Sequence, residues 1–188
     1  MELIFYGRGG QGAVTAASLL VQAADYDQKF AQAHPFFGFE RRGAPVSAFL
    51  RIDDKPIAAR GRVLLADCIV VLDPKLPELI DLTAALKAPA IAVMNLAKEP
   101  QGLAIYERVC KIGLVDANAI AAEIFGPAAI ASTNTIMLGA LSAATGWIRL
   151  ESILEAAKKK FRGPVLEKNE KAIQKGYEDT KVVQGGAK

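Results

Sequence analysis

Short apolar runs alternate with stretches of helical spacing over much of the chain. The run 3–6 ends at Gly7 and predicts a strand, and the alanine- and leucine-rich stretch 13–24 repeats its apolar positions at the spacing of a helix. Further strands are predicted over 30–34, 45–52, 68–72, 90–94 and 112–115, and further helices over 76–86 and 119–125. Apolar strands that alternate with helices are typical of a buried parallel sheet.

After residue 125 the pattern predicts helices only. The stretches 135–145, 150–160 and 166–177 have helical periodicity and are bounded by Gly or Pro, and we expect 181–188 to be a frayed tail. The length of 188 residues is in the usual range of one domain. The sequence therefore predicts a single domain over 2–180 of the α/β class, a Rossmann-like three-layer fold with a mostly parallel sheet and a helical C-terminal part.

Composition and charge exclude several classes of protein. Hydrophobic residues make up 52% and charged residues 23% of the chain, which excludes disordered and collagen-like proteins. The net charge of +3 is small, and the basic run 158–162 lies in a predicted helix, so no nucleic-acid partner is expected. No apolar run approaches the roughly 20 residues of a membrane span, and no signal-peptide pattern is present. We therefore expect a cytoplasmic protein without membrane contact.

Cysteine and histidine are too few for a metal or nucleophile site within the chain. Cys68 and Cys110 are the only cysteines and lie far apart in the sequence, so the chain alone is not expected to ligate an iron-sulfur cluster. His34 is the only histidine, and no candidate nucleophile lies near it in the sequence. A packed or hydrogen-bonded histidine at a strand end is the ordinary interpretation, so no catalytic residue and no metal ligand is assigned.

A glycine-rich turn, Gly7-Arg8-Gly9-Gly10-Gln11-Gly12, follows the first predicted strand and opens the first predicted helix. In that context its G-x-G-x-x-G spacing is typical of a loop that holds an anion at a helix N-terminus, because glycine accepts positive φ and leaves the free amides accessible. The side chains of Arg8 and Gln11 add donors at the same place. The alternative is that the glycines only allow a tight turn and close packing.

Two familiar uses of such a turn are disfavoured. A P-loop needs Lys and then Ser or Thr after the last glycine, whereas this chain continues with Ala13 and Val14. A dinucleotide site needs an acidic residue at the end of the second strand, where this chain has His34 and Pro35. Nucleotide hydrolysis and NAD binding are therefore not the favoured functions.

A second functional loop is predicted over 35–43. It combines three phenylalanines with the run Glu40-Arg41-Arg42, and three aromatic side chains on one loop indicate a partner surface. The guanidinium groups of Arg41 and Arg42 suit a phosphate, a carboxylate, a surface ion pair or an interface, and we favour the interface. Segment 132–135 is explained as the capping segment of a nearly apolar helix, which is expected to be buried in the fold or against another subunit.

Three motifs, in their order and spacing, resemble those of the gamma subunit of 2-oxoacid:ferredoxin oxidoreductases, most closely the pyruvate synthase branch. They are the turn 7–12, the segment 37–46 and the segment 134–141, and the resemblance covers roughly residues 2–178. It implies a Rossmann-like subunit of an assembly that converts pyruvate, coenzyme A and oxidised ferredoxin to acetyl-CoA, carbon dioxide and reduced ferredoxin. Segment 40–46 resembles the pyruvate and branched-chain 2-oxoacid members more than the 2-oxoglutarate members.

The resemblance also implies that most of the chemistry belongs to other chains. In this family thiamine diphosphate, magnesium and the iron-sulfur clusters belong to partner subunits of alpha, beta and delta type, so the isolated chain is expected to bind no cofactor and to be inactive. The gamma subunit covers the active site and helps to bind coenzyme A as a substrate. A homodimer stays open as the state of the isolated chain.

Residue by residue, the resemblance places one group of candidates at the coenzyme A phosphates. These are Arg8, Gly9, Gly10, Gln11 and Gly12. Arg41 and Arg42 either assist the same ligand or anchor the neighbouring subunit. The alternatives are a purely structural subunit, a gamma subunit of a 2-oxoisovalerate enzyme, and a free-standing dinucleotide-binding oxidoreductase.

Overall fold

A computed structural model describes residues 1–36, 44–99 and 104–187. Within these residues a seven-stranded sheet has the order β2-β3-β1-β4-β5-β6-β7. The strands are β1 (Glu2–Arg8), β2 (Phe30–Phe36), β3 (Pro45–Asp53), β4 (Ala66–Val71), β5 (Leu86–Asn95), β6 (Val109–Val115) and β7 (Lys181–Gln184). Strands β1, β4, β5 and β6 are parallel neighbours, whereas β3 and β7 run antiparallel to β1 and β6. The predicted α/β class with a mostly parallel central sheet is confirmed.

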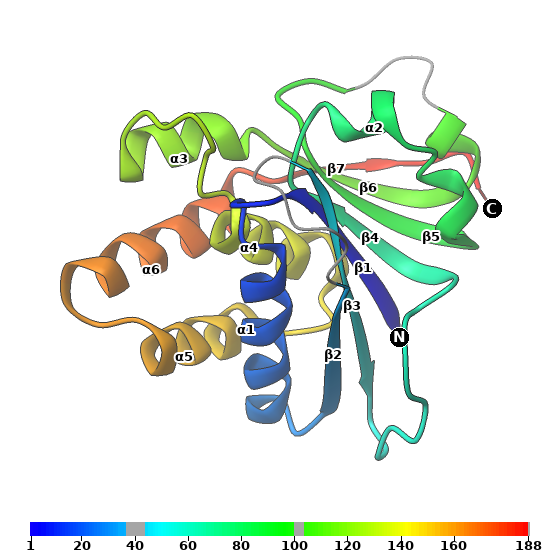
Figure 1. Ribbon diagram of the computed structural model, residues 1–188, viewed down its shortest axis with the longest axis horizontal. Helices are drawn as coiled ribbons and strands as arrows, with labels where there is room; N and C mark the ends of the chain where they lie inside the picture. Colours follow the sequence, from blue (N-terminus) through cyan, green and yellow to red (C-terminus); the bar gives the residue numbers. More distant parts are fainter. Residues whose placement is uncertain (37–43, 100–103, 188) are drawn as a thin grey trace.

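Most of the helices cover one face of the sheet (Figure 1). They are α1 (Ala13–Tyr26), α3 (Ala117–Phe125), α4 (Asn134–Thr145), α5 (Leu150–Lys160) and α6 (Gly163–Glu178). Leu3 and Phe5 of β1 point into this layer, and Ile4 between them points to the other face, as the two-residue period of a strand requires. That other face has only a thin cover, formed by loops, α2 (Leu76–Leu79) and the 3-10 turns η1 (Thr83–Ala85) and η2 (Ala104–Glu107).

Helices α4 and α6 pack with their backbones in contact. A Cβ atom on Gly139 would lie 1.9 Å from the carbonyl oxygen of Ile173, and one on Gly176 would lie 2.1 Å from that of Ile136. Each helix therefore needs a glycine where it meets the other. Helix α4 is buried on nearly all sides, so its expected burial is provided within the fold itself.

Two expectations about local structure are wrong. The predicted helix over 76–86 is broken, because the Asp81 carboxylate accepts hydrogen bonds from the backbone N–H and the hydroxyl of Thr83, at 2.9 and 2.6 Å, and starts a new turn there. The expected frayed tail over 181–188 begins with strand β7, which pairs antiparallel with β6. The pairing extends further, since Ala187 N–H donates to the Val109 carbonyl at 3.0 Å. Among the described helices none is both long and apolar enough to cross a membrane.

Candidate functional site

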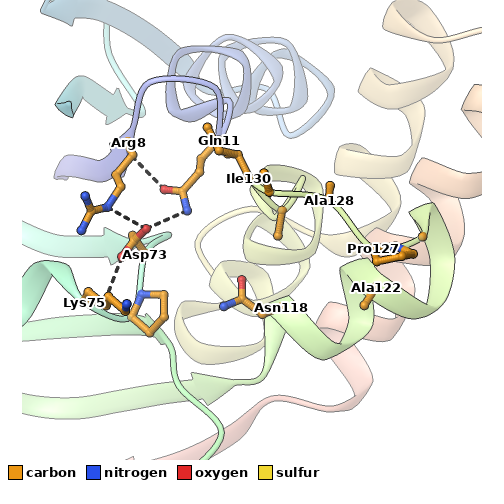
Figure 2. A pocket seen from close by; sticks show the side chains of 13 residues that line it. Arg8, Gln11, Asp73, Lys75, Asn118, Ala122, Pro127, Ala128 and Ile130 are labelled. Carbon is orange, nitrogen blue, oxygen red and sulfur yellow. Dashed lines mark hydrogen bonds and ion pairs between the residues drawn. The ribbon is translucent and has the colours of Figure 1, made fainter. Parts of the chain in front are cut away.

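The carboxyl ends of β1 and β4 form a crevice. These strands are parallel neighbours, but the chain leaves β1 into α1 on the helical face and leaves β4 into α2 on the thin face. Such a divergence opens the sheet edge in doubly wound folds. A cleft of about 550 Å³ lies there. Its polar side carries Arg8, Gln11, Asp73, Lys75 and Asn118, and its apolar side is formed by Ala122 and residues 126–131 (Figure 2).

The glycine-rich turn connects β1 to α1 and borders this cleft. Gly10 and Gly12 have φ of 101° and 80°, in the left-handed region that glycine tolerates. A Cβ atom on Gly12 would also lie 2.7 Å from Nδ2 of Asn134. The Gly9 N–H donates to the Ala44 carbonyl at 2.9 Å. The turn thus uses Gly10 for its conformation, and Gly12 for both its conformation and a close approach to α4.

Asp73 holds the turn in place. Its Oδ2 accepts hydrogen bonds from Nε2 of Gln11 and from Nε of Arg8, both at 3.0 Å, and its Oδ1 accepts one from the backbone of Lys75 at 2.9 Å (Figure 2). The Gln11 side chain is buried and its Oε1 accepts the Arg8 N–H at 2.8 Å, so Gln11 braces the turn. The Arg8 side chain is 27% exposed and carries a positive charge at the cleft wall.

Two helix N-termini meet at the turn. Helix α1 begins after Gly12 and helix α4 after Thr133, and within 1–36, 44–99 and 104–187 no side chain caps either of them. Asn134, the first residue of α4, is buried against Gly12. The Thr133 hydroxyl is buried and has no hydrogen-bond partner among the residues that the structure describes. Uncapped first-turn amides and the positive ends of two helix dipoles favour an anion at this point.

A second polar network fixes the floor of the crevice. Nδ2 of Asn95, at the end of β5, donates to the Leu72 carbonyl at 2.7 Å and to Oδ1 of Asn118 at 3.0 Å. Its Oδ1 accepts the N–H of Ala117 at 2.9 Å. The side chain is buried, so these bonds link the ends of β4 and β5 to the start of α3 and orient Asn118 at the cleft.

The structure gathers the predicted residues of the glycine-rich turn at one place. Arg41 and Arg42 lie outside the described residues, as do Phe37 and Phe39. Sequence reasoning missed Asp73, although its position directly after an apolar strand was a usable signal. It also explained Thr133 and Asn134 by capping alone. Segment 132–135 does lead into α4, but no capping bond forms. Among the described residues, no three His, Cys, Asp or Glu side chains are grouped so that they could hold a metal ion.

Fold and cleft together define an α/β protein with a partly polar cleft where β1 and β4 diverge. The family model described as "Pyruvate ferredoxin/flavodoxin oxidoreductase" matches residues 2–179. The chain belongs to this family, and the resemblance seen in its three motifs is confirmed.

Several known proteins resemble the chain over nearly its whole length. The pyruvate/ketoisovalerate oxidoreductases common subunit gamma of Pyrococcus furiosus is 47% identical over 98% of this chain and 99% of its own. Pyruvate synthase subunit PorC of Methanothermobacter thermautotrophicus is 44% identical, over 95% of each chain. The crystal structure of the pyruvate oxidoreductase subunit PORC of Thermotoga maritima is 33% identical, covers 98% of each chain and has a TM-score of 0.80.

Proposed function

We propose that this chain is the gamma subunit of a multisubunit pyruvate:ferredoxin oxidoreductase and that its glycine-rich turn receives phosphate groups of coenzyme A. Its kinship with gamma and PorC subunits supports the first part. In the assembled enzyme thiamine diphosphate, magnesium and iron-sulfur clusters on alpha, beta and delta subunits supply decarboxylation and electron transfer to ferredoxin. The present chain contributes the surface that positions the acyl acceptor.

The meeting of the α1 and α4 N-termini beside Arg8 carries this proposal. Coenzyme A is an anion with a pyrophosphate and a further phosphate, and such groups bind to free first-turn amides and guanidinium groups. The first-turn amides of α1 follow directly on Gly12, against which Asn134 packs, and the Asn134 amide group and the Thr133 hydroxyl supply neutral polar partners. Gly9, Gly10 and Gln11 keep the backbone in the shape that brings these groups together.

Asp73 contributes by ordering Arg8 before the ligand arrives. A charged side chain that is already held loses less conformational freedom when it binds, which improves affinity without a new contact. The Asp73 carboxylate also offsets part of the Arg8 charge. We therefore propose that the first-turn amides of α1 and Arg8 bind the phosphates together, rather than Arg8 alone.

We propose that other chains of the enzyme select the oxoacid. The name of the Pyrococcus furiosus relative assigns it to both pyruvate and ketoisovalerate oxidoreductases. One subunit can serve two such enzymes if it contacts coenzyme A, which both reactions use, and leaves the oxoacid to other chains. Pyruvate is the substrate we propose, and 2-oxoisovalerate is the second candidate on the strength of that shared subunit.

Kinetics of the assembled enzyme test the proposed binding site. In Arg8→Gln and Asn134→Ala variants we expect the KM for coenzyme A to rise by about tenfold or more, because a hydrogen bond to a charged group contributes about 1.5–3 kcal/mol. The KM for pyruvate should stay constant. Arg149→Gln is the matched control, since Arg149 is exposed and pairs with Asp27 away from the cleft.

The outcome separates the alternatives. An unchanged KM for coenzyme A in both the Arg8→Gln and the Asn134→Ala variant, in an enzyme that still assembles, would leave a purely structural subunit as the better explanation. A free-standing dinucleotide oxidoreductase would require the isolated chain to bind NAD or FAD in a calorimetric titration. We expect neither to bind, and we expect the isolated chain to show no pyruvate oxidation.

A further inference from the structure

The connection between β3 and β4 is longer than its path requires. In the sheet, β1 is the one strand between β3 and β4, so the connection has to pass two strand spacings, or about 10 Å. Residues 54–65, here called the β3–β4 arm, could span about 40 Å when extended. The arm is therefore not pulled tight, and it extends beyond the sheet edge at the lower right of Figure 1.

A partly buried arginine holds the arm in a defined shape. The Arg51 side chain is 13% exposed and pairs with Glu2 at 2.8 Å. Its other nitrogens donate to the carbonyl oxygens of Gly61 and Arg62, at 2.8 and 3.2 Å. Val63, the next residue, is buried against the thin face of the sheet. A surface that is ordered before it meets a partner loses less entropy on binding.

The arm exposes apolar and cationic side chains to solvent. Leu64 and Leu65 are 70% and 49% exposed, because Val63 and Ala66 on either side of them take the buried positions. Lys55, Arg60 and Arg62 are exposed on the same arm. Phe30, 47% exposed, lies at the same sheet edge because it pairs with Asp53, where the arm begins. Exposed large apolar groups along one end of the sheet, with cations on the same segment, are typical of an interaction surface.

We propose that the β3–β4 arm docks this chain on another subunit of its oxidoreductase. The partner presents an apolar surface that receives Leu64 and Leu65 and is bordered by carboxylates that pair with Arg60 and Arg62. This inference rests on the proposed multisubunit function. The arm lies at the amino edge of the parallel strands and the cleft at their carboxyl edge, so docking through the arm leaves the cleft open to its ligand.

Co-purification of the assembled enzyme tests the arm. A tagged chain is produced together with its partner subunits, and the amount of partner recovered is compared among variants. Leu64→Ser with Leu65→Ser should reduce recovery by about tenfold or more, since a central apolar anchor contributes more than 1.4 kcal/mol. Leu79→Ser is the matched control, because Leu79 is 59% exposed on α2, away from the arm. Arg60→Glu with Arg62→Glu should also lower recovery.

The isolated variants should melt as the wild-type chain does, because both leucines are exposed. Equal recovery of partner subunits by the leucine variant and the wild type would overturn the inference while leaving the proposed function intact. Conversion of an isolated dimer into a monomer with unchanged partner recovery would also overturn it, since a second copy would then be the occupant. Failure of the wild-type chain to recover any thiamine-dependent subunit would overturn the proposed function and this inference with it.

Discussion

Replacing Gly139 with alanine tests the backbone contact between α4 and α6. The new Cβ atom would lie 1.9 Å from the Ile173 carbonyl oxygen, whereas ordinary contacts begin near 3.4 Å, so the helices have to separate by about 1.5 Å. Overpacking of this kind costs about 1–3 kcal/mol and sometimes more, and here the obstacle is backbone, which cannot rotate away. Alanine recovers about 1 kcal/mol through its higher helix propensity.

We expect the Gly139→Ala change to lower the free energy of unfolding by about 1–3 kcal/mol, because separation of the helices also loosens the packing of Ile136 and Ile173, which are fully buried, and this loss of about 1 kcal/mol offsets the gain in helix propensity. For a chain of this length the melting temperature should fall by about 2–12 °C. Chemical denaturation and calorimetry measure both quantities. The shift should also raise the KM for coenzyme A in the assembled enzyme, since Asn134 is on the same helix.

The contact predicts a coupling as well. Once one alanine has pushed the helices apart, the second has more room, so Gly139→Ala with Gly176→Ala should cost less than the sum of the single changes. Lys171→Ala, on the exposed side of α6, is the control and should be nearly neutral. If the Gly139→Ala protein were more stable than the wild type, the helix propensity of alanine would outweigh the clash with the Ile173 carbonyl, and the close contact of α4 with α6 would be refuted.

Two further predictions concern titratable groups. Burial opposes ionisation of Asp27, but hydrogen bonds from Ser152 and Arg149 outweigh it and lower the pKa of its carboxyl group. Its contribution to stability is therefore present above the ordinary aspartate pKa and is lost as the pH falls through the lowered value. Asp27→Asn should cost about 1–2 kcal/mol at neutral pH and flatten the acid limb of a stability profile; an unchanged acid limb would contradict this. Burial, together with the charge of Asp67, raises the pKa of the Cys68 thiol, which should resist a thiol reagent until the protein unfolds; rapid labelling of Cys68 in the native state would contradict this.

Local sequence pattern was sufficient for the elements that carry their own signal. Helix α1 follows from a run of alanine and leucine at helical spacing, and β4 from a β-branched run. Strand β7 could not be predicted in this way, because it is defined by pairing with Lys111–Leu114, about seventy residues earlier. The broken helix after β4 depends on one side chain, Asp81, competing for the backbone, and apolar periodicity does not report that competition.

In the candidate site, too, some residues could be predicted from local sequence and others could not. The glycine-rich turn was predictable because its residues are contiguous and lie between a strand and a helix. Asp73 and Asn134 reach the turn only through the pairing of β1 with β4 and the contact of α4 with Gly12. The bracing role of Gln11 depends on the same pairing. Residues that are distant in the sequence and come into contact only in the folded chain produce no local pattern from which that contact could be predicted.

A structure of the assembled enzyme with coenzyme A bound would test whether the glycine-rich turn holds the phosphates of coenzyme A. We expect a phosphate oxygen within hydrogen-bond distance, about 3 Å, of the backbone amides at the start of α1, with Arg8 and Asn134 beside it. Coenzyme A phosphates bound elsewhere, with the cleft between β1 and β4 filled by a neighbouring subunit, would contradict it.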